Sequence, residues 1–330
     1  MNSGRAINYS MRVAKNIERK MIRDVLLRLY SFAHTSSYQY IGFGSKYFTD
    51  FILFHRYLHI KKMISIESDT GGRFKYEFNK PFSCVDIKFG GSSDILPTLD
   101  YSEKTIIWLD YDGVLNNLCL NDISLFSTKA VSGSVLLVSY NSRPYKNSEL
   151  ASELPDVDSG ERQKTKFLSQ IDSKYIPYGE DYKGLGRWDG HSRLLNRTIN
   201  TCVSDALGIV NVALDENNKM CFSQILNFNY QDGVEMSTVG FIFYNESDKA
   251  LLDSCKFDEI EYYRQGDDYF EIKVPNFTIK EAKCILEKMP MEQSGFRGTG
   301  LDRKVFTETD VKAFSKIYKY NPYYLDADII

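Results

Sequence analysis

Two glycines and one carboxylate occupy positions that suit the binding of a nucleotide-type ligand. Gly42 and Gly44 lie in the segment IGFGS, directly after the short apolar run at residues 38–41. A glycine lets the backbone turn tightly against a ligand, because a Cβ atom there would push the ligand away. Glu67 ends a second apolar run, at the spacing of about 20 residues where the dinucleotide fingerprint places a ribose-binding acid. These three residues predict a site for an adenosine group.

A second set of polar residues follows two strongly apolar runs further along the chain. Asp110 and Asp112 close the run KTIIWLDYDG, and Asn141 ends the run GSVLLVSYN. Two carboxylates so close together rarely both stay ionised when they are desolvated. One of them could therefore act as a general base toward a nucleophilic hydroxyl or amine, with Asn141 positioning a polar substrate group. The alternatives are that Asp112 caps the next helix and that Asn141 closes a loop.

Five apolar runs separated by helical segments must position these residues. The runs are YQYI, KKMISIE, FSCVDIKF, KTIIWLD and GSVLLVSYN. Their alternation with helices predicts a Rossmann-like α/β fold with a mostly parallel sheet. Ligands of such sheets bind beyond the carboxyl ends of the strands, so the polar residues named above should meet at one edge. Two later runs, MCFSQILNFNY and STVGFIFYN, flank the turn QDGVE and predict an antiparallel hairpin.

The chain divides into three predicted parts. Residues 1–36 hold a basic amphipathic helix, residues 37–250 form the Rossmann-like domain, and residues 251–330 form a small α+β appendage. A polar insertion at residues 142–190 is expected to be a lid or a flexible loop. Trp188, near the end of this insertion, either stacks over the ligand or anchors the insertion in the protein.

Composition limits the possible partners and compartments. The 330 residues, 43% of them hydrophobic, can bury a large core, and the net charge of -3 gives no overall attraction to nucleic acids or membranes. The six cysteines are scattered without a CxxC pair, and no apolar stretch is long enough to span a membrane, so we expect a soluble cytoplasmic protein. His55 and His59 lie four residues apart without a nearby third ligand, so no metal site is predicted.

The predicted helix from about Met11 to Leu29 is locally basic. Between Arg5 and Arg28 the sequence has seven basic and two acidic residues, interleaved with apolar residues at four-residue spacing. This basic outer face could steer a nucleic acid backbone, although a solvated helix surface is the commoner explanation. Nucleic acid therefore remains a candidate partner, and an oligomer is also compatible with the sequence.

Between about Tyr38 and Asn141 the chain resembles the class I S-adenosylmethionine-dependent methyltransferases. IGFGSKYF stands at the place of their glycine-rich first motif, ISIESD at the ribose-binding acid, FGGSSDILPTL beside the adenine ring, and WLDYDG at the fourth-strand motif. The late hairpin matches the antiparallel pair that closes their sheet. The resemblance implies S-adenosylmethionine as the cofactor. The cofactor-binding residues that it implies are Gly42, Phe43, Gly44, Ser45, Glu67, Ser68, Gly91, Ser92, Ser93 and Asp110.

The chain also departs from the pattern of this family. Tyr40 stands where an acid usually precedes the first glycine, Lys46 replaces the third glycine, and Ser92 replaces the acid of the third motif. Asp50 or Asp110 could supply the missing contact to the methionine amino group. A dinucleotide cofactor fits less well, since its fingerprint requires a glycine at the position of Tyr47.

The implied function is methyl transfer to an unidentified hydroxyl or amine of a small molecule or a nucleic acid. The alternative is a methyltransferase-like module that has lost catalysis and serves binding or assembly in a larger complex. Enzymes that methylate ribose use a Lys-Asp-Lys-Glu tetrad. Lys15 and Asp110 could fill two of its places, but no lysine ends the fifth strand, so the tetrad is not supported.

Overall fold

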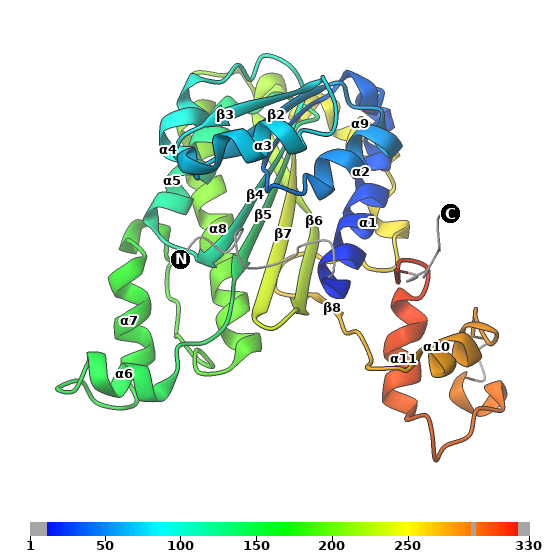
Figure 1. Ribbon diagram of the computed structural model, residues 1–330. Helices are drawn as coiled ribbons and strands as arrows, with labels where there is room; N and C mark the ends of the chain where they lie inside the picture. The colour runs from blue at the N-terminus through cyan, green and yellow to red at the C-terminus, as the bar shows by residue number, and fades with distance from the viewer. Residues whose placement is uncertain (1–11, 292–294, 323–330) are drawn as a thin grey trace.

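The computed structural model describes residues 12–291 and 295–322, and one eight-stranded sheet organises them (Figure 1). The strand order is β3-β2-β1-β4-β5-β7-β6-β8. Strands β1 to β5 run parallel, and β7 is antiparallel to both β5 and β6. The predicted Rossmann-like fold with a late antiparallel hairpin is thereby confirmed. The strands are β1 (Gln39–Phe43), β2 (Lys62–Glu67), β3 (Val85–Phe89), β4 (Thr105–Val114), β5 (Val135–Asn141), β6 (Met220–Gln231), β7 (Glu235–Asn245) and β8 (Phe270–Ile272).

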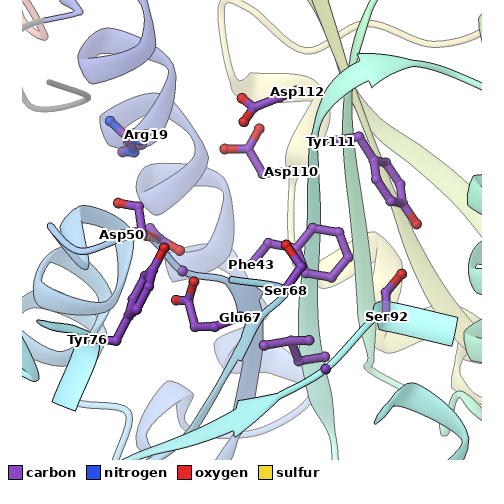
Figure 2. A pocket seen from close by; sticks show the side chains of 14 residues that line it. Arg19, Phe43, Asp50, Glu67, Ser68, Tyr76, Ser92, Asp110, Tyr111 and Asp112 are labelled. Atoms are coloured by element: carbon purple, nitrogen blue, oxygen red, sulfur yellow. The ribbon is translucent and has the colours of Figure 1, made fainter. Parts of the chain in front are cut away.

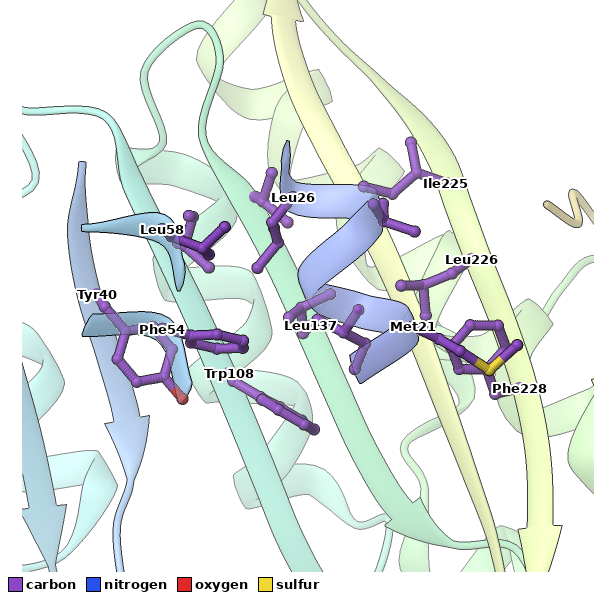
Figure 3. Packing of buried hydrophobic residues seen from close by; sticks show 14 of the residues in the cluster. Met21, Leu26, Tyr40, Phe54, Leu58, Trp108, Leu137, Ile225, Leu226 and Phe228 are labelled. Atoms are coloured by element: carbon purple, nitrogen blue, oxygen red, sulfur yellow. The ribbon is translucent and has the colours of Figure 1, made fainter. Parts of the chain in front are cut away.

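Helices cover both faces of the sheet, because alternate residues of each strand point to opposite faces. Trp108 of β4 belongs to a core with α1 (Val13–Leu27) and α2 (Thr49–Leu58), whereas Leu109 packs on the side of α5 (Asn117–Lys129) and α8 (Trp188–Asn211). Figure 3 shows Met21 of α1 beside Leu226 of β6 on the first face. The remaining helices are α3 (Arg73–Asn79), α4 (Ser92–Ile95), α6 (Asn147–Glu153), α7 (Arg162–Gln170), α9 (Lys249–Ser254), α10 (Ile279–Leu286) and α11 (Glu308–Ile317).

Helix α1 lies against the sheet more deeply than its sequence predicts. It packs against α2, β6 and β8, and its apolar residues belong to the main core. Two of its basic residues, Lys15 and Arg19, are buried as well. The prediction that the basic residues form an outer face is therefore wrong for these two, since α1 turns them toward the interior. The nucleic acid partner stays a prediction. Arg5, at the start of the basic segment, and Met11, at the predicted start of the helix, lie outside the described residues.

The N-terminus of α1 is held by a residue far away in the sequence. Asp232, in the turn between β6 and β7, accepts hydrogen bonds from the backbone N–H groups of Ala14, at 3.2 Å, and Lys15, at 2.8 Å. Its carboxylate thus occupies the place of an N-cap side chain, where it also suits the positive end of the helix dipole. This contact connects the start of α1 to the hairpin.

The segment at residues 142–190 extends away from the sheet with helices α6 and α7 (Figure 1). Its two ends meet at Ser142, which accepts a hydrogen bond from Trp188 Nε1 at 2.8 Å through its hydroxyl group. The carbonyl oxygen of Ser142 lies 3.0 Å from His191 Nδ1. Of the two predicted roles for Trp188, the structure supports the anchor.

Residues after 250 contribute to two cores. Cys255, Tyr262 and β8 pack within the main core, and β8 adds a parallel edge strand to β6. Helices α10 and α11 enclose a separate cluster that includes Ile285 and Phe314 (Figure 1). The predicted domain boundaries stay a prediction, and residues 323–330 lie outside the described part. Across the described residues, no helix combines the length and apolarity needed to cross a bilayer.

The cap on α1 leads to a stability prediction. Asp232→Ala should lower the free energy of unfolding by about 1 kcal/mol, because two helix N–H groups lose their acceptor. Urea unfolding followed by circular dichroism measures the change. Asp215→Ala is the matched control, since Asp215 accepts a bond from Asn218 N in an exposed single turn and should cost less than about 0.5 kcal/mol. Equal losses at both positions would contradict the anchoring role of Asp232.

Candidate functional site

A cleft of about 280 Å³ opens at the carboxyl ends of β1, β2 and β4. This volume is slightly below the range of roughly 300 to 1,000 Å³ found for ligand pockets. The cleft lies where the strand order reverses between β1 and β4, which is the usual ligand position in open α/β sheets. Figure 2 shows its lining side chains. They belong to Arg19, Phe43, Gly44, Ser45, Asp50, Ile66, Glu67, Ser68, Tyr76, Gly90, Ser92, Asp110, Tyr111 and Asp112.

Most of the residues predicted for the site meet in this cleft. The predicted residues that line it are Phe43, Gly44, Ser45, Glu67, Ser68, Ser92, Asp110 and Asp112. Four predicted residues are not among the lining residues. Gly42 lies within β1, where a Cβ atom would clash with the Tyr40 hydroxyl. Gly91 and Ser93 belong to the start of α4, and Asn141 Oδ1 accepts a hydrogen bond from Arg143 N at 2.9 Å, which supports its loop-closing role.

Glu67 and Gly44 form the centre of the cleft. Glu67 is only 4% exposed as a residue, and its carboxyl group accepts a hydrogen bond from Ser65 Oγ at 2.9 Å. A Cβ atom on Gly44 would collide with both the Ser65 hydroxyl and the Glu67 carboxyl group, so a side chain here would force these two groups to move. Burial raises the pKa of Glu67 to about 8, against the opposing effect of the Ser65 hydrogen bond.

A second carboxylate reaches the cleft from α2. The buried Tyr40 hydroxyl donates a short hydrogen bond to Asp50, and the Tyr40 ring packs edge-on against Phe51 and Phe54. Burial raises the pKa of Asp50, and the positive charge of Arg19 opposes this effect. Tyr40, which replaces the usual acid of the first motif, thus holds a carboxylate supplied by the neighbouring helix. Position 40 itself therefore needs no acid.

Helix α1 contributes residues that the sequence did not assign to the cleft. Arg19 lines the cleft directly. Lys15 lies behind the cleft, with its ammonium group 2.8 Å from Asp110 Oδ1. Burial alone would raise the pKa of Asp110, but the Lys15 charge and hydrogen bond hold it below its usual value. The spacing of Lys15, Glu18 and Arg19 places them on one helix face, yet no local signal shows that this face is buried.

An aromatic wall lies opposite the carboxylates. The rings of Phe43 and Tyr111 meet edge-on with centroids 5.2 Å apart. Asp122 of α5 accepts hydrogen bonds from Tyr111 OH at 2.9 Å and from Ser92 Oγ at 2.6 Å, and so fixes both side chains. Figure 2 shows Tyr111 and Ser92 across the cleft from Arg19, Asp50 and Glu67.

Asp112 and the histidines also have defined surroundings. The alternative that Asp112 caps α5 is wrong, because Asn116 is the cap and its Oδ1 accepts bonds from Leu118 N and Cys119 N.

His55 Nδ1 lies 2.8 Å from the carbonyl oxygen of Ile60. Within the part of the chain that the structure describes, no group of three or more His, Cys, Asp or Glu side chains could hold a metal ion.

Comparison with known proteins identifies a family and related structures. The family model described as "Putative O-methyltransferase" matches residues 7–329. Trm1 from Pyrococcus horikoshii, solved with S-adenosyl-L-methionine, is 10% identical with a TM-score of 0.43, over 74% of this chain and 60% of that chain. The O-methyltransferase TomG from Streptomyces achromogenes, solved with SAM, is 13% identical with a TM-score of 0.34, over 68% of this chain and 79% of that chain. The chain thus spans less than two thirds of Trm1. No curated protein matches the sequence.

The buried Glu67 carboxyl group predicts a pH-dependent stability. Its pKa rises from 4.5 to about 8 on folding, so the folded protein holds more protons than the unfolded chain between these values, and stability falls as pH rises through this window. Glu67→Gln should remove this loss and raise the free energy of unfolding above pH 8 by on the order of 2 kcal/mol. Thermal unfolding across pH 5 to 9 measures it.

Glu103→Gln serves as the control, because Glu103 is a half-exposed carboxylate paired with Lys62 at the surface. This variant should follow the pH profile of the wild type. A Glu67→Gln protein that is less stable than the wild type at high pH would show that the ionised carboxylate is stabilised in the fold.

Proposed function

The chain belongs to this O-methyltransferase family, and from that premise we propose that it binds S-adenosylmethionine in the cleft and methylates a hydroxyl group. Family membership confirms the resemblance to methyltransferases that the motifs indicated. The observation that carries the cofactor assignment is the contact of Gly44 with Glu67. A buried carboxyl group is placed at the end of β2, beside Gly44 directly after β1, where a Cβ atom would collide with it.

The lining residues suit the separate parts of S-adenosylmethionine. Glu67 would accept hydrogen bonds from the two ribose hydroxyl groups. The adenine ring would lie along the wall of Phe43 and Tyr111, with Ser92 as a polar contact at its edge. This wall is preformed, since Asp122 fixes Tyr111 and Ser92 without any ligand.

Charged residues at the other end of the cleft suit the methionine group. Arg19 would bind the carboxylate, and Asp50 would bind the ammonium group, replacing the acid that is missing at Tyr40. Asp50, Asp110 and Asp112 give this end several carboxylates beside one lining arginine. Such surroundings favour a cation, and the sulfonium of the methylated cofactor is one.

The chemistry requires alignment and a proton acceptor. When bound, S-adenosylmethionine supplies a methyl group whose bond electrons remain on sulfur as the carbon forms its bond to the acceptor oxygen. The protein must hold the acceptor in line with that methyl group and remove the hydroxyl proton. Asp110 is the candidate base, since it lines the cleft and Lys15 favours its ionised form, which is the form that can accept a proton. Asp112 is available to orient the acceptor.

The first test is binding of the cofactor to the purified full chain. Calorimetric titration with S-adenosylmethionine should show binding to the wild type, and Glu67→Ala should weaken it at least about tenfold, because hydrogen bonds to a charged group are lost. Glu103→Gln should bind as the wild type does. Unchanged affinity in Glu67→Ala would remove the ribose role. Binding without methyl transfer to any hydroxyl compound would instead favour the non-catalytic binding module.

A second prediction is that binding of the cofactor releases a proton from Glu67. In the free protein the Glu67 carboxyl group is largely protonated at pH 7, since its pKa is about 8, whereas a ribose-binding carboxylate must be ionised. Binding at pH 7 should therefore release up to one proton, and the affinity should rise with pH until about pH 8 and then level off. Calorimetry in buffers of different ionisation enthalpy measures the release, and Glu67→Gln should abolish it. Proton uptake on binding would contradict the assignment.

A further inference from the structure

A single buried ammonium group lies between two carboxyl groups directly behind the cleft. Lys15 Nζ is 2.8 Å from Asp110 Oδ1 and 2.9 Å from Glu18 Oε2. The side chains of Lys15 and Glu18 are 3% and 0% exposed, whereas Asp110 is 25% exposed and lines the cleft. The two carboxyl groups therefore share one cation, but only Asp110 can meet a ligand.

Neighbouring side chains hold the ammonium group in place. Tyr230 OH lies 3.1 Å from Lys15 Nζ and Ser139 Oγ lies 3.3 Å from it, while the Trp108 ring is centred 4.7 Å away. Trp108 Nε1 also donates to Ser139 Oγ at 2.9 Å. The Lys15 side chain is thus enclosed by β4, β5 and β6, and its backbone N–H is held by Asp232. Little freedom remains for it to leave Asp110.

On the side of Lys15 away from the cleft, hydroxyl groups form hydrogen bonds with and around Glu18. Thr238 Oγ1 donates a short hydrogen bond to Glu18 Oε1, and Ser139 Oγ lies 2.6 Å from Thr238 Oγ1. Arg19 on α1 is the other cation that acts on Asp110, and it acts more weakly than Lys15. Asp110 also acts on Asp50 and on Tyr40. Among the described residues, the titratable groups named here belong to α1, α2, β1 and β4, and Tyr230 of β6 acts on Lys15.

One cation cannot compensate two desolvated carboxylates equally. Burial raises the pKa of Glu18, and Lys15 offsets this only in part. For Asp110, burial is the largest single effect and raises the pKa, but the charge and hydrogen bond of Lys15, together with Arg19 and Ser139, outweigh it, so the pKa falls. Burial lowers the pKa of Lys15, but Asp110 and Glu18 raise it above its usual value, so the ammonium stays charged. The surroundings therefore leave the negative charge on the carboxylate that faces the cleft.

We propose that Lys15 is a positioning residue that keeps the Asp110 carboxylate ionised and directed into the cleft, where Asp110 accepts the proton of the hydroxyl substrate. This inference rests on the proposed methyl transfer. As the oxygen–methyl bond forms, the oxygen–hydrogen bond breaks and the proton passes to a carboxylate oxygen of Asp110. The partial exposure of Asp110 lets that proton leave to solvent afterwards. Glu18 contacts the same ammonium group from the buried side, and neither Lys15 nor Glu18 contacts the substrate.

The test measures the titration of Asp110 directly in the full chain. Carbon NMR of protein labelled at the aspartate carboxyl carbons follows each group, and Asp110→Asn identifies the Asp110 signal by its loss. In the wild type, Asp110 should titrate below the ordinary value of 3.8. Lys15→Met, which removes the charge at similar volume, should raise the proton affinity of Asp110 by at least about tenfold.

Glu18→Gln is the matched control, because it removes the buried carboxyl group and keeps its shape. In this variant Asp110 should still titrate at low pH, since Lys15 then pairs with Asp110 as its single carboxylate. If Lys15→Met does not fold, the double variant Lys15→Met/Glu18→Gln, which leaves no unpaired carboxyl group at position 18, provides the comparison. An Asp110 group that titrates at or above 3.8 in the wild type overturns the proposal, as does a titration that Lys15→Met leaves unchanged.

These measurements need no cofactor, so they separate the inference from the proposed function. A wild type that fails to bind S-adenosylmethionine contradicts the function whatever the NMR titration shows. If the wild type binds S-adenosylmethionine but the Asp110 titration is the same in Lys15→Met, only the positioning role is contradicted.

Discussion

The burial of helix α1 against the sheet is the constraint on which the cleft depends. An isolated helix of this composition would expose Lys15 and Arg19, because desolvating a cation is costly unless a partner compensates it. The cost is offset here because Asp110, Glu18 and the hydroxyl groups of β5 and β6 surround Lys15. The same contacts bring Arg19 to the cleft. The geometry of the helix and the electrostatics of the site are therefore inseparable.

The cleft concentrates carboxyl groups at some expense to stability. Asp50, Glu67 and Asp110 are supplied by three separate elements, and burial disfavours the ionised form of each. Their proton affinities differ because their partners differ. Lys15 beside Asp110 favours the anion, whereas the close donor to Glu67 in the part of the chain that the structure describes is the neutral hydroxyl of Ser65. Such contrasts among neighbouring acids are typical of sites that bind cations or transfer protons.

The structure also shows how a departure from a family pattern can be compensated. Tyr40 replaces an acid on β1, but its hydroxyl group holds Asp50 of α2 beside the cleft. A negative charge is thus present although the usual position lacks it. On the opposite wall, Asp122 of α5 orients Tyr111 and Ser92 in a comparable way. In both cases a hydrogen bond between a motif position and a residue outside the recognised motifs fixes a side chain that lines the cleft.

The sequence by itself determined the strands β1 to β7, the parallel arrangement of the first five, the late hairpin and the meeting of Gly44, Glu67 and Asp110, but not the edge strand β8. These features follow from apolar periodicity and from the rule that parallel strands present their carboxyl ends at one edge. Only the tertiary structure decided that Gly42 and Asn141 do not line the cleft, that Asn116 rather than Asp112 caps α5, and that Lys15 and Arg19 face inward. The physical reason is the distance along the chain over which the two kinds of information extend. Periodicity reports the faces of one element, whereas the surface that covers a face is set by contacts between residues far apart in the chain, such as Asp232 with α1.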